Sequence, residues 1–318
     1  MAKKQFKAES KRLLDLMINS IYTHQEIFLR EIISNASDAI DKLAYQALTD
    51  EKVGLSRSDF AIELKPDETA RTLTVSDNGI GMDKDEMENN LGTICRSGSL
   101  QFKQALDKDK AADTDIIGQF GVGFYSAFMV ADKVTVISKK YGSDEAWKWE
   151  SEGADGYTMT PCERAAAGTD VIMQLKADTD DEKYSRFLKT WELQSLVRKY
   201  SDYIRYPIRM EVEKTRAKEG TENEYEHYFE VETLNSMVPL WKKNKNEITA
   251  EEYNSFYKEK FYDWQDPLKV IHTSAEGTAT YNALLFIPAK APMDYYSRDY
   301  EKGLQLYASG VLIMEKCA

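Results

Sequence analysis

Residues 28–39 read Phe-Leu-Arg-Glu-Ile-Ile-Ser-Asn-Ala-Ser-Asp-Ala, and this stretch decides how the first part of the chain folds. Apolar side chains recur here and just beyond at spacings of three and four residues, which predicts a helix with one buried face. These side chains are Phe28, Ile32, Ala36, Ala39 and Leu43. The helical pattern covers residues 9–47, which contain no glycine or proline, with a break near Thr23.

The same helix carries a polar face beside that stripe. Glu31, Asn35 and Asp38 stand at i, i+4 and i+7, so they lie within about 60° of one another. A carboxylate can orient or deprotonate a water, and an Asn carbonyl oxygen is a hard ligand that suits Mg²⁺. For any one residue the polar flank of an amphipathic helix is the simpler interpretation, whereas the three together favour a lined cleft.

The composition sets the broad class. The 318 residues include 42 Lys and Arg against 54 Asp and Glu, a net charge of −12, which weighs against non-specific DNA binding. The 42% of hydrophobic residues suffices for packed cores. Cys95, Cys162 and Cys317 are widely spaced, which excludes a disulfide framework or a Cys-type zinc site and indicates a reducing cytoplasm. The N-terminus lacks the apolar segment of a secretory signal.

The rest of the pattern predicts an α+β chain of two domains. Between the domains, the charged stretch 214–226 contains Gly220 and reads as a linker, giving an N-terminal domain at 1–212, a linker at 213–228 and a second domain at 229–318. In the first domain we expect strands at 60–65, 71–76, 133–139, 146–150, 157–160, 169–175 and 204–212, helices at 124–130 and 181–203, and short helices with loop over 84–107.

In the second domain, Thr249 and Glu252 form a capping box that predicts a helix to about Phe261. Strands are expected at 278–287 and 304–314. Because the chain stops at Ala318, directly after an apolar strand, we expect it to be a fragment.

Two loops complete the candidate site. Asp77-Asn-Gly-Ile-Gly-Met82 follows a strand, and Asp77 could accept a hydrogen bond from the amine of a base, although this motif alone is read more simply as an Asx turn. Gly118-Gln-Phe-Gly-Val-Gly-Phe124 precedes a helix and would expose N–H groups to an anion, and its glycine density favours phosphate contact over a hinge. Gly168-Thr-Asp170 alone indicates a turn.

Other chemistries lack support. His24, His227 and His272 are far apart and show no metal-ligand spacing, and neither a Walker A sequence nor a Gly-x-Ser-x-Gly motif occurs. Aromatic and lysine residues interleave over 241–264, which a protein-contact surface or an amphipathic helix explains better than nucleic-acid stacking.

Taken in this order and spacing, the motifs at 28–39, 77–82, 90–94 and 118–125 resemble those of the 90-kDa heat-shock chaperones in their bacterial form. The resemblance runs from about residue 5 to the end. It implies an N-terminal two-layer α/β sandwich of the Bergerat ATP-binding type, with a mixed, mostly antiparallel sheet, followed by the start of an α/β middle domain.

The resemblance also implies roles for individual residues. Glu31 would activate the attacking water as the catalytic residue, Asn35 would ligate Mg²⁺ at the phosphates of ATP or ADP, and Asp77 would contact the adenine amine with support from Thr169. Arg96 stands where many relatives have lysine, and residues 91–123 would form a lid. The other nucleotide-binding residues implied are Asp38, Met82, Asn90, Leu91, Arg96, Gly118, Gln119, Phe120, Gly121, Val122, Gly123 and Phe124.

The implied function is an ATP-dependent, stress-related chaperone that hydrolyses MgATP slowly and closes its lid to remodel unfolded or partly folded client proteins. We expect a cytoplasmic protein without nucleic-acid or membrane partners, a homodimer at full length and a monomer as this fragment. Hydrolysis is expected to be weak because the family's Asn-x-Ser-Arg-Glu loop does not occur here. The alternatives are a DNA-acting ATPase of the gyrase or MutL type, and a nucleotide-binding switch without turnover.

Overall fold

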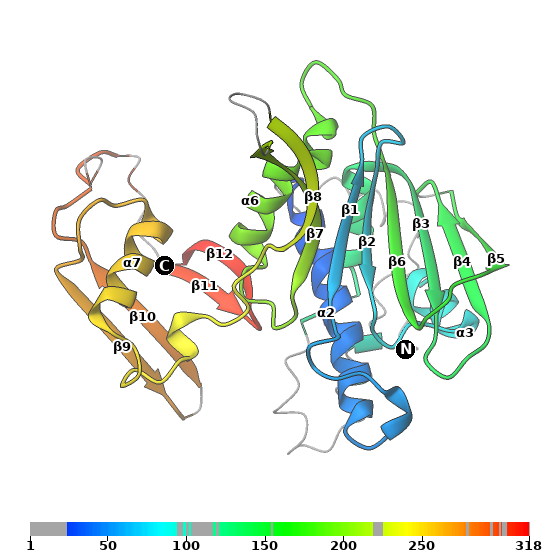
Figure 1. Cartoon of the computed structure of the whole chain (residues 1–318), viewed down its shortest axis with the longest axis horizontal. Helices are drawn as coiled ribbons and strands as arrows, with labels where there is room; N and C mark the ends of the chain where they lie inside the picture. Colours follow the sequence, from blue (N-terminus) through cyan, green and yellow to red (C-terminus); the bar gives the residue numbers. More distant parts are fainter. Residues whose placement is uncertain are drawn as a thin grey trace, which may run out of the picture. The chain divides into compact units, whose positions relative to one another are not determined.

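The computed structural model describes residues 24–93, 98–99, 102, 117–118, 121–153, 155–218, 225–277, 280–292, 295–298, 300 and 304–317 (Figure 1). The chain divides into two compact units, Met1–Asn235 with Ala308–Val311, and Ser236–Tyr307 with Leu312–Ala318. The strands of the first unit are β1 (Ile62–Asp67), β2 (Thr72–Asp77), β3 (Ala131–Lys139), β4 (Ala146–Ser151), β5 (Tyr157–Cys162), β6 (Gly168–Leu175), β7 (Ile208–Ala217) and β8 (Tyr225–Thr233). Its helices are α2 (Ile27–Ala47), α3 (Lys84–Leu91) and α6 (Thr190–Tyr200), with 3-10 turns η2 (Glu51–Val53), η3 (Gly123–Met129) and η4 (Tyr184–Leu188).

The described strands of the first unit form one eight-stranded sheet in the order β5-β4-β3-β6-β2-β1-β7-β8. Within this described sheet β1 and β7 pair in parallel, and the other neighbours pair antiparallel. The expected mixed, mostly antiparallel sheet in an α+β fold is therefore confirmed. The order matters for function because β6, distant in sequence, lies directly beside β2.

Helix α2 packs its apolar stripe against β1, β2 and β6 (Figure 1). Phe28, Ile32 and Leu43 are at most 2% exposed, and burying side chains of this size contributes roughly 1.5–3 kcal/mol each. Ala36 is buried as predicted, whereas Ala39 is half-buried. The stretch 28–39 thus fixes one helix across the sheet, with its polar face along the edge of that contact. The predicted helical residues before 24 lie outside the described part of the chain.

The second unit holds η5 (Leu240–Lys242), α7 (Ala250–Phe261) and two hairpins, β9 (Lys269–Ala275) with β10 (Tyr281–Ile287), and most of β11 (Leu304–Ala308) with β12 (Val311–Cys317). The predicted capping box is present, since Thr249 accepts from the Glu252 N–H and Glu252 accepts from the Thr249 N–H. Tyr257 packs its ring on Phe286 with centroids 5.2 Å apart, which seats α7 on β10.

Two predictions about local structure are wrong. The helix expected at 181–203 is split into η4 and α6, with Lys189 extended between them. The break places Phe187 edge-on against Phe28, with ring centroids 5.0 Å apart, so tertiary packing overrides the helical pattern. The strand expected at 304–314 is a hairpin that turns at Ser309 and Gly310, both of which have positive φ.

The predicted linker at 213–228 also differs from the structure. Most of its described residues belong to β7 and β8, which form an antiparallel ladder. Lys214 Nζ lies 2.8 Å from Glu230 Oε2 and 2.6 Å from Glu232 Oε1. Arg216 forms an ion pair with Glu226. Opposite charges facing each other across a ladder stabilise it, so a charge run that reads as a linker folds as a hairpin. The boundary between the two units falls after Asn235 instead.

The loop after β2 passes so close to β3 that a side chain has no room. A Cβ on Gly81 would lie 1.9 Å from the Lys139 carbonyl oxygen, and its φ is +66°. Gly142 has a similar φ of +78° but open space around it. The two positions therefore separate the cost of backbone conformation from the cost of close packing.

We expect Gly142→Ala to lower the free energy of unfolding by about 1–2 kcal/mol, because only the positive φ is penalised. Gly81→Ala should cost about 1–3 kcal/mol more, because the same penalty is joined by a clash with backbone. Urea denaturation followed by circular dichroism measures both. Equal losses in the two variants would contradict the close approach.

Candidate functional site

The polar face of α2 presents its three predicted residues in different environments. Glu31 is half-buried, and its Oε1 accepts from Arg30 Nε at 3.0 Å and Nη2 at 2.5 Å. Asn35 is exposed, and Asp38 is 1% exposed. The face therefore presents an ion-paired carboxylate, an exposed amide and a buried acid along consecutive turns of the helix.

Backbone N–H groups at the end of the predicted lid hold Asp38. Its two carboxylate oxygens accept from the N–H of Ile117 at 2.8 Å and of Gly118 at 2.9 Å. Burial raises the pKa of Asp38, while these two N–H groups and Lys42 act in the opposite direction. Burial lowers the pKa of Lys42, and the nearby carboxylates of Asp38, Glu86 and Asp77 oppose that change. The half-buried Lys42 thus lies near acids from three elements.

The glycine turn lies directly against this face. A Cβ on Gly118 would meet Asn35 Oδ1 and Asp38 Oδ2 at 3.1 Å, and one on Gly123 would meet Glu31 Oε2 at 2.3 Å. Because both positions lack a side chain, the backbone approaches the three polar side chains closely. This cradle of amide and carboxylate oxygens beside backbone N–H groups has the donor chemistry that a Mg²⁺–phosphate group requires.

Asp77 ends β2 inside the protein, at 7% exposure. Its Oδ1 accepts from the Gly79 N–H at 2.9 Å. Burial raises the pKa of Asp77 to about 7, while the N–H of Gly79 and the charge of Arg164 lower it and Asp170 raises it further. The predicted Asx turn and the predicted base contact are therefore compatible, because one carboxylate oxygen serves the turn.

The Asp77 loop reaches α2 by backbone contact. The Ile80 N–H donates to the Ala39 carbonyl at 3.0 Å, and a Cβ on Gly79 would lie 2.5 Å from the Ala39 carbonyl carbon. This contact brings the end of β2 against the helix that carries Glu31 and Asn35. The two motifs predicted separately in the sequence therefore belong to one region.

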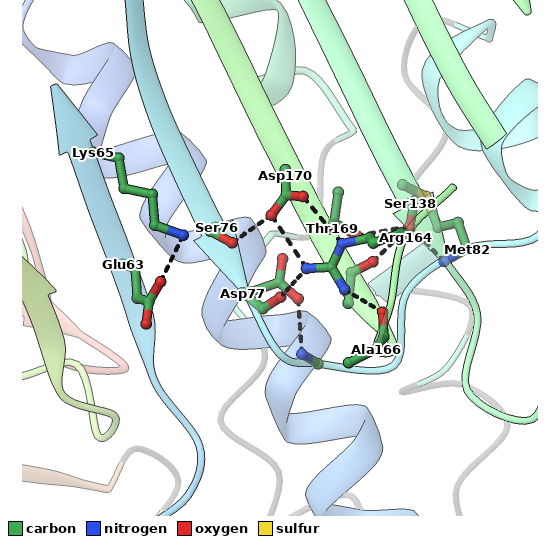
Figure 2. A network of polar contacts seen from close by, with 12 residues as sticks. Glu63, Lys65, Ser76, Asp77, Met82, Ser138, Arg164, Ala166, Thr169 and Asp170 are labelled. Carbon is green, nitrogen blue, oxygen red and sulfur yellow. Dashed lines mark hydrogen bonds and ion pairs between the residues drawn. The ribbon is translucent and has the colours of Figure 1, made fainter. Parts of the chain in front are cut away.

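The hydroxyl groups of Ser138 and Thr169 connect β3 and β6 next to Asp77, as Figure 2 shows. Ser138 on β3 lies 2.9 Å from the Thr169 hydroxyl on β6 and accepts from the Met82 N–H at 2.8 Å. Both hydroxyl residues are buried, at 0% and 7% exposure. Thr169 thus lies next to Asp77 in register, since the two residues pair across β6 and β2.

The remaining described site residues line the same region. Asn90 on α3 lies with Nδ2 3.9 Å from the Met82 sulfur. The Leu91 carbonyl accepts from Tyr125 Oη at 2.9 Å, and Phe124 packs edge-on against Trp149 with centroids 5.5 Å apart. Gly121, with φ +66°, and Val122 precede η3 and are half-buried. Arg96, Gln119 and Phe120, with most of the predicted lid at 91–123, lie outside the described residues.

Three residues with a place in this region were not predicted from the sequence. Ser138 follows Val134 and Val136 at inward positions of β3, so a polar residue in a buried register was the available signal. Lys42 continues the polar face of α2 one turn beyond Asp38. Arg164 gave no signal, because its contacts depend on how the β5–β6 loop returns to β2.

The part of the chain that the structure describes contains no helix with the length and apolar character that a membrane span needs. In that same part of the chain no group of three or more His, Cys, Asp or Glu side chains is arranged to hold a metal ion.

The pKa of Asp77 predicts how stability depends on pH. Because the folded chain holds this proton more tightly than the unfolded chain, the favourable contribution is complete below about pH 4 and is lost as pH rises through about 7. We expect Asp77→Asn to gain stability relative to the parent between pH 4 and pH 8, by an amount on the order of a few kcal/mol. Thermal unfolding at both pH values measures it.

Asp59→Asn is the control. The Asp59 carboxylate accepts from Ser56 on an exposed turn, which lowers its pKa, so its contribution is lost only below about pH 4 and this variant should show nearly the same stability difference from the parent at pH 4 and pH 8. A stability difference between Asp77→Asn and the parent that is the same at pH 4 and pH 8 would contradict the buried, proton-holding environment of Asp77.

Comparison with known proteins agrees with this geometry. Residues 22–177 match the family described as histidine kinase-, DNA gyrase B- and HSP90-like ATPase, and residues 220–318 match the Hsp90 protein family. The chain is 59% identical over 317 residues to the chaperone protein HtpG of Clostridium botulinum strain Langeland, and 59% identical over 318 residues to that of Bacillus subtilis strain 168. HtpG of Clostridium perfringens strain ATCC 13124 is 58% identical.

These alignments cover 100% of this chain but 50–51% of each relative, so the chain spans about half the length of the curated relatives it matches. The ATPase match contains α2, β1, β2, β3 and β6, the elements that build the site described above. The Hsp90 match begins at residue 220, near the end of the first unit, and covers the second unit. On both matches and on the identity to HtpG along its whole length, this chain belongs to the Hsp90 family.

Proposed function

We propose that this chain binds MgATP and hydrolyses it slowly, as the nucleotide-driven part of a molecular chaperone that acts on unfolded or partly folded proteins. The observation that carries the proposal is the convergence of three features on one region. These are the polar face of α2, the glycine turn against it and the buried carboxylate at the end of β2. The name of the relatives, chaperone protein HtpG, supports the cellular role.

Asp77 would accept a hydrogen bond from the adenine amine, with Thr169 beside it, because a buried carboxylate at a strand end is a directional acceptor. The backbone N–H groups of the glycine turn would face the phosphates. Mg²⁺, held by Asn35, would neutralise phosphate charge when bound. Each of these roles assigns one part of the nucleotide to one element of the site.

Glu31 would orient and deprotonate the attacking water. Its carboxylate lies against Gly123 and is paired with Arg30. A base held this way contributes to turnover and little to ground-state affinity. Closure of the segment 91–123 would exclude water around it, and this motion would be what drives client remodelling.

We expect Glu31→Ala to bind ADP and ATP within about threefold of the parent and to lose turnover by about 10²–10⁴-fold, because a general base contributes that much. Asp77→Asn should lose nucleotide binding, because an amide cannot replace the charged acceptor. Isothermal titration and a phosphate-release assay measure the two effects. Glu51→Ala, which removes an exposed acid on η2, is the control.

Turnover unchanged in Glu31→Ala would refute its role as the base. Tight ATP binding by Asp77→Asn would refute the assignment of the base pocket. Binding without measurable turnover in the parent would instead support the alternative of a nucleotide-binding switch in this chain.

The chain by itself should hydrolyse ATP more slowly than a full-length relative, because the Asn-x-Ser-Arg-Glu loop expected of the middle domain does not occur in it. Steady-state phosphate release by the two proteins at equal concentration tests this. Equal rates would contradict it. Homodimerisation of the full-length protein and a cytoplasmic location stay predictions.

The DNA-acting alternative has less support. A gyrase or MutL relative would need a basic second domain, whereas the net charge is −12 and residues 220–318 match Hsp90. Filter binding to duplex DNA at low salt distinguishes the two, since retention of DNA by the chain would favour the alternative.

A further inference from the structure

A network of polar contacts lies next to the backbone of Asp77. The proposed chemistry gives these contacts no role. The centre of the network is Arg164, in the loop between β5 and β6 (Figure 2). The guanidinium donates from Nε to Asp170 Oδ2 at 3.1 Å and from Nη2 to Asp170 Oδ1 at 3.2 Å. The Arg164 side chain is 13% exposed and that of Asp170 26%. This two-pronged pair is geometrically specific and largely shielded from solvent.

The same guanidinium reaches a second strand. Arg164 Nη2 also donates to the backbone carbonyl of Asp77 at 3.1 Å, and Nη1 donates to the Ala166 carbonyl of its own loop. Asp170 in turn accepts from the hydroxyl of Ser76. Because Ser76 and Asp77 are consecutive, the ion pair holds the backbone that carries the Asp77 carboxylate from two adjacent positions.

The end of the Arg164 loop is packed against the same residue. Gly168 has φ +127°, and a Cβ there would lie 2.1 Å from the Asp77 carbonyl oxygen. In the sheet, Asp77 pairs with Thr169 and Ser76 with Asp170. The position of Asp77 therefore depends on the loop that Arg164 closes.

The charged groups facing Asp77 come from three elements. Arg164 from the β5–β6 loop favours its ionised form, Asp170 from β6 opposes it, and Lys42 from α2 contributes a positive charge. The N–H groups of Gly79 and Thr169 also favour the ionised form. Without Arg164, the negative charge of Asp170 on the neighbouring strand would act on Asp77 without compensation, and a nearby carboxylate favours the uptake of a proton.

The protonation state of Asp77 decides which group at position 6 of a purine it can hydrogen-bond. An ionised carboxylate only accepts hydrogen bonds, so it suits the 6-amino group of adenine. A protonated carboxyl also donates, so it can satisfy the 6-oxo group of hypoxanthine. A site that must prefer adenine near neutral pH therefore needs a neighbour that keeps this carboxylate charged and in place.

We propose that Arg164 is a positioning residue that sets base specificity, by fixing Asp77 against β6 and compensating Asp170, so that the site accepts 6-amino purines and rejects 6-oxo purines. This inference rests on the proposed nucleotide-binding function. A simple role in closing the turn is the competing explanation, and it predicts a loss of affinity that is independent of pH and of the base.

The test measures the dissociation constants of ADP and IDP by calorimetry from pH 6 to pH 9. In the parent, ADP should bind more tightly than IDP, and its affinity should fall as Asp77 gains a proton. In Arg164→Met, the midpoint of that fall should move upward by about one pH unit, and the preference for ADP at pH 7 should decrease by about 3–10-fold.

Arg71→Met is the matched control. Arg71 Nη2 also contacts an aspartate and a backbone carbonyl, Asp178 Oδ1 at 3.2 Å and Lys176 O at 2.6 Å. It lies just before β2, at the opposite end of that strand from Asp77. We expect this variant to keep both the parent's pH midpoint and its preference for ADP.

A second variant acts in the opposite direction and covers the case in which Arg164→Met does not fold. Asp170→Asn removes the negative charge that raises the pKa of Asp77 and keeps the positive charge of Arg164, which lowers it. The pH midpoint of the fall in ADP affinity should therefore move to lower pH. A midpoint and an ADP preference unchanged in either folded variant would overturn the proposal, as would a loss of affinity that is uniform over pH and base. Absence of ADP binding by the parent would instead refute the proposed function.

Discussion

The site depends on the backbone contact between the loop after β2 and the middle of α2. The Ile80 N–H donates to the Ala39 carbonyl, and Gly79 lies so close to that turn of the helix that a Cβ would overlap it. Since α2 carries Glu31 and Asn35, and β2 ends at Asp77, this contact fixes how far the polar face of α2 lies from the carboxylate proposed to bind the base. The apolar stripe of α2 holds the contact in place, because it buries Ile32 and Leu43 against the sheet.

Sequence reasoning succeeded where the information is local. The apolar spacing of α2, the strands predicted near β1 to β6 and the capping box at Thr249 each depend on neighbouring residues, and the structure confirms them. Asp77 and Thr169 could be linked only through the family resemblance. Their pairing comes from the insertion of β6 between β3 and β2, and no local pattern specifies that order.

The failures have the same physical origin. The charged segment before Tyr225 reads as a linker because its charges look solvated, yet the partner charges lie on the strand that follows. The 181–203 pattern reads as one helix, yet the chain breaks that helix at Lys189 and packs the Phe187 ring edge-on against Phe28. Arg164 was invisible for the same reason, because its partners Asp77 and Asp170 become neighbours only in the folded sheet.

The proposed site is acidic and its proposed ligand is anionic, so the acids would repel the phosphates unless other groups compensate their charge. Each carboxylate that would repel phosphate is already engaged: Glu31 by Arg30, Asp38 by the N–H groups of Ile117 and Gly118, and Asp77 by the N–H of Gly79 with Arg164 behind it. Partnered carboxylates project less negative potential into the cleft than isolated ones. Asn35, which is uncharged and exposed, is then the group on α2 that can approach a Mg²⁺–phosphate group without repulsion. At the proposed nucleotide site, specificity for the base and tolerance of the phosphates would thus depend more on how the acids are paired than on how many acids the site contains.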